Sequence, residues 1–162
     1  MPSALFQSQL LLNLTSAHHT ITAAIPHMLS RNSGTIVNNA SLTALRYIGK
    51  PQIGYAAAKA GLLQYTRHLA AQHAPNGIRA NCVVPGIIWT PLVENLGNSE
   101  KEEDRAVCEA IRKTGEKAPL GRMGTADDVA MAVTFLCSER ASGFMTGQEL
   151  VIDGGLSICT PY

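Results

Sequence analysis

The sequence has almost no excess charge and no long apolar run. Its 162 residues include 13 basic and 12 acidic side chains, which gives a formal net charge of +1. Proteins that bind nucleic acids or anionic membranes by electrostatics carry a clear basic excess, so neither is expected as a partner. No uncharged apolar stretch reaches the roughly 18 residues that a membrane-spanning helix needs.

The sequence also lacks closely spaced metal-binding or disulfide-forming side chains. The four cysteines, Cys82, Cys108, Cys137 and Cys159, lie far apart, whereas zinc knuckles and redox dithiols need a close pair. The five histidines have no partner one helical turn away, so no metal site is expected. The first residues have neither the basic start nor the continuous apolar core of a secretory signal. We therefore expect free thiols and a cytoplasmic location.

What is present is typical of a globular protein. Hydrophobic residues make up 46% of the chain and charged residues 15%. This composition argues against disorder, collagen and coiled coil. The length suits one domain, residues 1–162, with a substantial core.

Hydrophobic periodicity predicts alternating helices and strands. Apolar residues recur every three or four positions from residue 5 to about 28, which indicates one long helix. A second helix is expected from about 55 to 74, ahead of the turn Pro75-Asn76-Gly77. Short apolar runs at 35–37, 78–84 and 150–152 indicate buried strands. The predicted fold class is therefore α/β with a parallel sheet.

The segment 87–124 has a looser pattern, and its length suggests a lid over a site. One helix is expected there, opened by a capping box at Ser99-Glu100-Lys101-Glu102. Thr125-Ala126-Asp127-Asp128 should cap the helix that follows. Four apolar residues of this segment either line a substrate pocket or simply pack the lid: Trp89, Leu92, Val93 and Leu96.

Tyr55 and Lys59 carry the clearest chemical signal. They are four residues apart at the start of the second helix, hence on one face and one turn apart. A nearby ammonium group and the positive end of a helix both favour a phenolate, which suits a tyrosine to general acid and base work. In a parallel sheet, ligands bind at the carboxyl ends of the strands, where Ser41 follows the first strand. Its hydroxyl could bond a substrate carbonyl or hydroxyl beside the phenol.

These residues belong to a larger set that resembles the classical short-chain dehydrogenase/reductase family over essentially the whole chain. The set comprises Asn13, Asn38-Asn39-Ala40-Ser41, Tyr55-Ala56-Ala57-Ala58-Lys59, Asn81-Cys82-Val83-Val84-Pro85-Gly86 and Asp153-Gly154-Gly155. By this resemblance the fold is a Rossmann-type parallel sheet, and the chain is about the C-terminal half to two-thirds of a doubly wound domain.

The resemblance implies a role for each matched residue. Tyr55 would be the catalytic acid and base, Lys59 would hold the nicotinamide ribose, Ser41 would orient the substrate, and Asn13 would hold a proton-relay water. A further segment would lie against the nicotinamide: Pro85, Gly86, Ile88 and Thr90. The implied reaction is hydride transfer between NAD or NADP and a small carbonyl or secondary alcohol substrate.

One departure from the family is large. No Gly-x-Gly-x-x-Gly turn occurs, so the pyrophosphate-binding part of the family is absent from this sequence. The strand at 35–37 would then have an unpaired edge. An alternative follows, in which the chain is a truncated, catalytically inactive member that associates with full-length subunits. The family also typically dimerises through the two long helices, so a homo-oligomer through those helices is expected.

Overall fold

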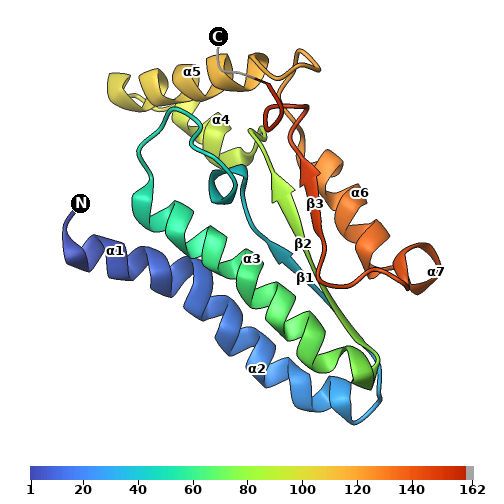
Figure 1. Ribbon diagram of the computed structural model, residues 1–162. Helices are drawn as coiled ribbons and strands as arrows, with labels where there is room; N and C mark the ends of the chain where they lie inside the picture. Colours follow the sequence, from blue (N-terminus) through green and yellow to red (C-terminus); the bar gives the residue numbers. More distant parts are fainter. Residues whose placement is uncertain (160–162) are drawn as a thin grey trace.

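The computed structural model describes residues 1–159 and contains a parallel three-stranded sheet with helices on both faces (Figure 1). The strands are β1 (Gly34–Asn39), β2 (Ile78–Pro85) and β3 (Glu149–Ile152), and their order in the sheet is β1-β2-β3. Ile36 is paired with Ala80, and Val84 with Val151. The predicted α/β fold with a parallel sheet is therefore confirmed, and each strand is slightly longer than expected.

The helices form three groups around the sheet. On one face lie α1 (Ser3–Leu10), the π-helical stretch η1 (Leu11–Thr15), α2 (Ser16–Leu29) and α3 (Ile53–His73). On the other face lie α6 (Ala126–Cys137) and α7 (Glu139–Ser142), and α4 (Pro91–Gly97) and α5 (Glu102–Glu116) cover the carboxyl ends of the strands (Figure 1). Short 3-10 turns, η2 (Leu42–Ala44) and η3 (Ala74–Asn76), flank α3.

The core lies between α3 and the central strand. Every residue of β2 before Pro85 is buried. From α3, Leu62 and Leu63 are buried against this side of the sheet. Removal of these apolar side chains from water is the main force that holds α3 to the strands.

Two glycines of α3 let the first helix come close. A Cβ atom on Gly54 would lie 3.1 Å from Cβ of Gln9, and one on Gly61 would lie 3.1 Å from Cδ2 of Leu14. Glycine costs about 1 kcal/mol relative to alanine inside a helix. The close contact between the helices offsets that cost, and it fixes how far α1 and η1 stand from α3.

Several local expectations need correction. The long helix predicted at 5–28 is confirmed, but it contains the π-helical stretch η1, which periodicity alone does not reveal. The capping box predicted at Ser99 is wrong: Lys101 is the N-cap of α5, and Ser99 Oγ instead donates to the Asp104 carboxylate at 2.6 Å. The lid segment holds α4 as well as α5. The capping box predicted at Thr125 is confirmed, with Asp128 as its reciprocal partner.

The four lid residues divide between surface and core. Val93 is buried, whereas Leu92 and Trp89 are exposed. Leu96 is half-buried. Packing of the lid therefore accounts for Val93 at least.

One edge of β1 is open in the described part of the chain. The amide of Gly34 donates to Gly77 O and that of Ala40 to Val83 O, so the even-numbered residues of β1 direct their backbone groups to β2. Backbone direction alternates along a strand, so Thr35, Val37 and Asn39 direct theirs away from β2. Such an edge can bind another strand. The predicted unpaired edge is therefore confirmed.

The four cysteines are free thiols, as predicted. Cys82 and Cys108 are buried, and burial raises the pKa of the Cys82 thiol to about 11. Within residues 1–159, no helix is both long enough and apolar enough to span a membrane.

A buried arginine joins β2 to its neighbours. Arg79 Nη1 donates to Leu136 O at 3.1 Å and to Met145 O at 3.3 Å, and its Nη2 donates to Thr35 Oγ1 at 3.1 Å. Its Nε pairs with the exposed carboxylate of Glu139 at 3.2 Å. Arg79 therefore connects β1, β2 and the α6–α7 region through one side chain.

We predict that Arg79→Met lowers the free energy of unfolding by about 2–4 kcal/mol, because it removes several hydrogen bonds and the Glu139 ion pair from a buried position that joins three parts of the fold. Urea denaturation followed by circular dichroism measures the change. Arg31→Met, at an exposed arginine, is the control and should have little effect. Equal stability of the two variants would contradict the connecting role of Arg79.

Candidate active site

The carboxyl ends of the three strands meet beneath α4 and α5. Ser41 follows β1, Pro85 ends β2 and Asp153 follows β3. The Gly86 amide donates to Ile152 O at 2.9 Å, which holds the ends of β2 and β3 together. A Cβ atom on Gly86 would lie 2.7 Å from Cβ of Asp153, so only glycine fits here without a shift.

Tyr55 and Lys59 lie on one face of the first turns of α3. Lys59 Nζ is 5.6 Å from the centroid of the Tyr55 ring, as the four-residue spacing predicts. Both side chains are half-buried. The ammonium group lies over the ring, in the arrangement of a cation–π contact.

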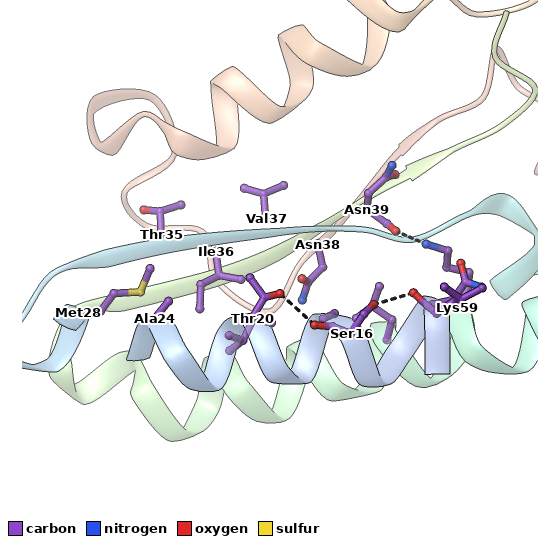
Figure 2. Close-up of a pocket in the computed structure, with 15 residues that line it drawn as sticks. Ser16, Thr20, Ala24, Met28, Thr35, Ile36, Val37, Asn38, Asn39 and Lys59 are labelled. Carbon is purple, nitrogen blue, oxygen red and sulfur yellow. Dashed lines mark hydrogen bonds between the residues drawn. The ribbon is translucent and has the colours of Figure 1, made fainter. Parts of the chain in front are cut away.

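Lys59 has one hydrogen-bond acceptor in the described structure, the carbonyl of Asn39, at 2.8 Å (Figure 2). This carbonyl belongs to the outward-directed set of β1. Burial lowers the pKa of the Lys59 ammonium group. Because an ammonium group has three donors, two N–H groups remain for a ligand.

Asn13 and Lys59 line the same cavity, of about 430 Å³, between α2 and β1. Figure 2 shows Ile36 and Asn38 pointing from β1 toward α2, while Thr35 and Val37 point away. Asn13 lies within η1, and its Nδ2 donates to Gln9 O and Gln9 Oε1, both at 3.1 Å. π-Helical stretches in α-helices are frequent at functional sites.

Ser41 starts the 3-10 turn η2. Its Oγ accepts from Thr43 N at 3.3 Å and is 3.0 Å from Thr43 Oγ1. The side chain is half-buried and lies at the carboxyl end of β1. Ser41 is not among the residues that line the Asn13–Lys59 cavity.

The segment after β2 lies apart from that cavity. Ile88 forms a parallel bridge with Gly124, and both line a smaller cavity of about 140 Å³ with Asp153. Thr90 is the N-cap of α4, but its side chain makes no capping hydrogen bond. Its hydroxyl therefore does not hold the start of α4. The structure thus brings Asn13 to Lys59 and places Ile88 beside the end of β3.

Sequence reasoning missed the polar core that positions these residues. Asn38 Nδ2 donates to Thr66 Oγ1 at 2.7 Å, and that hydroxyl donates to Leu62 O at 2.7 Å. The Cys82 thiol is 3.1 Å from the same hydroxyl. These buried contacts join β1, α3 and β2. Asn38 is part of the family-like motif after the first strand, but nothing in the sequence pointed to Thr66 as its partner.

Among residues 1–159, no three His, Cys, Asp or Glu side chains are grouped closely enough to hold a metal ion.

Comparison with known proteins gives matches along almost the whole chain. Residues 1–157 match the family model described as enoyl-(acyl carrier protein) reductase. The chain is 42% identical over 153 residues to a 3-oxoacyl-(acyl-carrier-protein) reductase of Chlamydia pneumoniae. This match covers 94% of the chain and 56% of the relative.

Solved structures agree with these matches. An oxidoreductase of the short-chain dehydrogenase/reductase family from Burkholderia thailandensis superposes with a TM-score of 0.83 and 35% identity, over 96% of this chain and 57% of that one. A 3-oxoacyl-(acyl-carrier protein) reductase with bound NAD from Brucella melitensis gives a TM-score of 0.80 and 31% identity, over 98% and 54%. The chain therefore has the Rossmann-type fold of these proteins and spans little more than half of their length.

We predict that the Lys59 ammonium group titrates below the ordinary lysine value of 10.5, because burial disfavours its charged form. The folded state then binds fewer protons than the unfolded state in the pH window just below 10.5. The contribution of Lys59 to the free energy of unfolding should therefore rise as the pH increases through that window.

Two measurements check this. Carbon-13 NMR of the Lys59 Cε atom gives the midpoint directly, and a midpoint at or above 10.5 contradicts the prediction. The difference in unfolding free energy between the wild type and Lys59→Gln, measured by urea denaturation over the same window, should grow with pH. Taking this difference removes most of the contribution of other groups, such as Cys82.

Proposed function

Since the chain belongs to the short-chain dehydrogenase/reductase family, we propose that it carries the catalytic centre of an NAD- or NADP-dependent oxidoreductase. The reaction would transfer a hydride between the nicotinamide and a carbonyl or secondary alcohol. The observation that carries this proposal is the Tyr55–Lys59 pair, with Nζ 5.6 Å from the ring centroid, at the carboxyl ends of the strands.

The residues present suit one part of the cofactor. Lys59 has two N–H groups left for ribose hydroxyls, and the hydroxyl of Thr90, which makes no capping bond to α4, suits a carboxamide. With Pro85, Gly86 and Ile88, Thr90 would form the wall beside the nicotinamide. No Gly-rich turn in the sequence could hold a pyrophosphate, so the chain supplies the nicotinamide half of the site. When bound, the nicotinamide supplies or accepts the hydride.

The protein side chains would handle the proton and the orientation of the substrate. Tyr55 would donate a proton to a carbonyl oxygen in reduction and accept one from the hydroxyl in oxidation. The Lys59 ammonium group would stabilise the phenolate that reduction leaves behind. Ser41 Oγ would bond the same substrate oxygen and fix its position. Asn13, in the Asn13–Lys59 cavity, would hold a water that returns the proton to Tyr55.

The names of the relatives direct the substrate test to 3-oxoacyl thioesters first. NAD and NADP are both to be tried, because the part of the fold that selects between them is not in this sequence. Two protein forms are needed: the chain alone, and a chimera in which the chain replaces the matching part of the Chlamydia pneumoniae relative. NAD(P)H absorbance at 340 nm reports turnover in each form. In the cell, we expect the reaction to take place in the cytoplasm.

We predict that Tyr55→Phe lowers turnover by about 100-fold or more in the form that is active, because phenylalanine has no proton to transfer. The same absorbance assay measures the change. Tyr47→Phe is the matched control, since Tyr47 is 70% exposed, and it should retain normal turnover. Near-normal turnover of Tyr55→Phe would exclude the proposed mechanism.

The second candidate function is association without catalysis, and the open edge of β1 favours it. In this case the chain is inactive alone and joins full-length subunits. It would then bind no NAD(P)H by itself and would co-purify with a full-length family member. Tight cofactor binding by a monomeric chain would reject this candidate.

Either function is compatible with self-association through the long helices. A shallow and mostly apolar depression between η1 and α3 is lined by Leu14, Gly61, Tyr65 and His68, among others. It lies on the side of these helices that no other described element covers. A second copy packing here would form the homo-oligomer that the family resemblance implies.

We predict that Gln64→Asp combined with His68→Asp shifts the chain toward the monomer, because it adds negative charge to this face. Both positions are exposed, so the fold should tolerate the change. Sedimentation velocity measures the oligomeric state. Met131→Asp, on the exposed face of α6, is the control for added charge. A monomeric wild type, or an oligomer that the double variant leaves intact, would exclude this surface as the interface.

A further inference from the structure

An arginine outside the catalytic set joins the Ser41 loop to the last described turn of the chain. Arg46 Nη1 donates to Leu156 O at 2.9 Å, Ser157 O at 3.0 Å and Cys159 O at 2.8 Å. This nitrogen has two hydrogens for three acceptors, so at least one hydrogen is shared. Three converging carbonyl groups repel one another, and a cation at their centre stabilises the arrangement.

On one side, Arg46 is joined rigidly to Ser41. Ala44 N donates to Ser41 O at 2.9 Å, and Arg46 N donates to Leu42 O at 3.1 Å. Leu42 is only 1% exposed, so it anchors this 3-10 turn in the core. Displacement of the Arg46 side chain would therefore be transmitted over a short, hydrogen-bonded turn to the Ser41 hydroxyl.

On the other side, residues 153–159 touch two further walls of the candidate site. The Asp153 carboxylate accepts from the amides of Gly155 and Ser157, which shapes this turn. Gly154 O accepts from Leu120 N at 3.1 Å, at the end of the lid segment. Asp153 also packs against Gly86. Residues 153–159 thus link the end of β2, the lid and, through Arg46, the Ser41 loop.

We propose that Arg46 is a positioning residue that holds Ser41 at the substrate by binding it to the turn at 153–159. The proposal rests on the proposed function, because it assigns Arg46 a role in that reaction. Arg46 does not touch the reacting atoms. It acts through Ser41, and this dependence can be measured.

The kinetic test is a double-mutant cycle in the form that turns over. Arg46→Met should lower kcat/KM about tenfold, and Arg46→Lys should recover part of the loss, since an ammonium group can also bind converging carbonyls. In a Ser41→Ala background, Arg46→Met should have little further effect, because the group it positions is already gone. Lys50→Met, at an exposed lysine of the same loop, is the control for loss of charge.

The outcomes separate the two proposals. If Ser41→Ala itself leaves kcat/KM unchanged, the proposed mechanism fails. If Ser41→Ala is impaired but the effect of Arg46→Met is absent or adds fully to it, only the positioning role of Arg46 fails.

Hydrogen exchange tests the role of Arg46 in the 162-residue chain even without turnover. Arg46→Met should speed amide exchange in both 42–46 and 154–159, and leave α2 unchanged. Arg46→Lys should speed it less. Unchanged exchange in either segment would overturn the proposal.

Discussion

The hydroxyl of Thr66 is the contact on which the rest of the site depends. It lies in the core and is shared by Asn38 of β1, Cys82 of β2 and the backbone of α3 itself. An unpaired polar group at this depth would cost about 1–3 kcal/mol, so the three elements are held in the one arrangement that satisfies all of them. That arrangement sets the rotation and height of α3 against the sheet. The first turns of α3, with Tyr55 and Lys59, are thereby fixed relative to the end of β1.

The position of Lys59 shows how the sheet and the helix jointly produce a chemical environment. Its nitrogen reaches the carbonyl of Asn39, one of the backbone groups that β1 directs away from β2. Burial of the ammonium group, which disfavours its charged form, lowers its pKa. A lysine on the exposed stripe of α3 would have neither feature. The edge of β1 therefore contributes to the site as well as to the architecture.

Sequence patterns predicted what depends on local spacing. The parallel strands, α3, the Thr125 capping box and the Tyr55–Lys59 pair all follow from residue types within a few positions of one another. What depends on contacts distant in sequence was missed. Thr66 accepts a hydrogen bond from Asn38, which is 28 positions away in the sequence. Arg46 donates one to the carbonyl of Leu156, which is 110 positions away. Ser99 was misassigned because its hydroxyl could cap a helix but bonds the carboxylate of Asp104 instead. The matched roles of Tyr55, Lys59, Ser41, Asn13 and the segment at Pro85 to Thr90 stay predictions.

The π-helical stretch at 11–15 allows one continuous helix to pack against α3 at its start and against the strands further on. Each residue advances an α-helix by about 100°, so a single widened turn changes the direction in which all later side chains point. Before it, Gln9 of α1 packs against Gly54 of α3, whereas beyond it Ile21 of α2 packs against the strands. A perfectly regular helix of this sequence could align one of these contacts only at the expense of the other. The irregular turn thus corrects the rotational phase of the helix, so that both contacts form along one continuous helix.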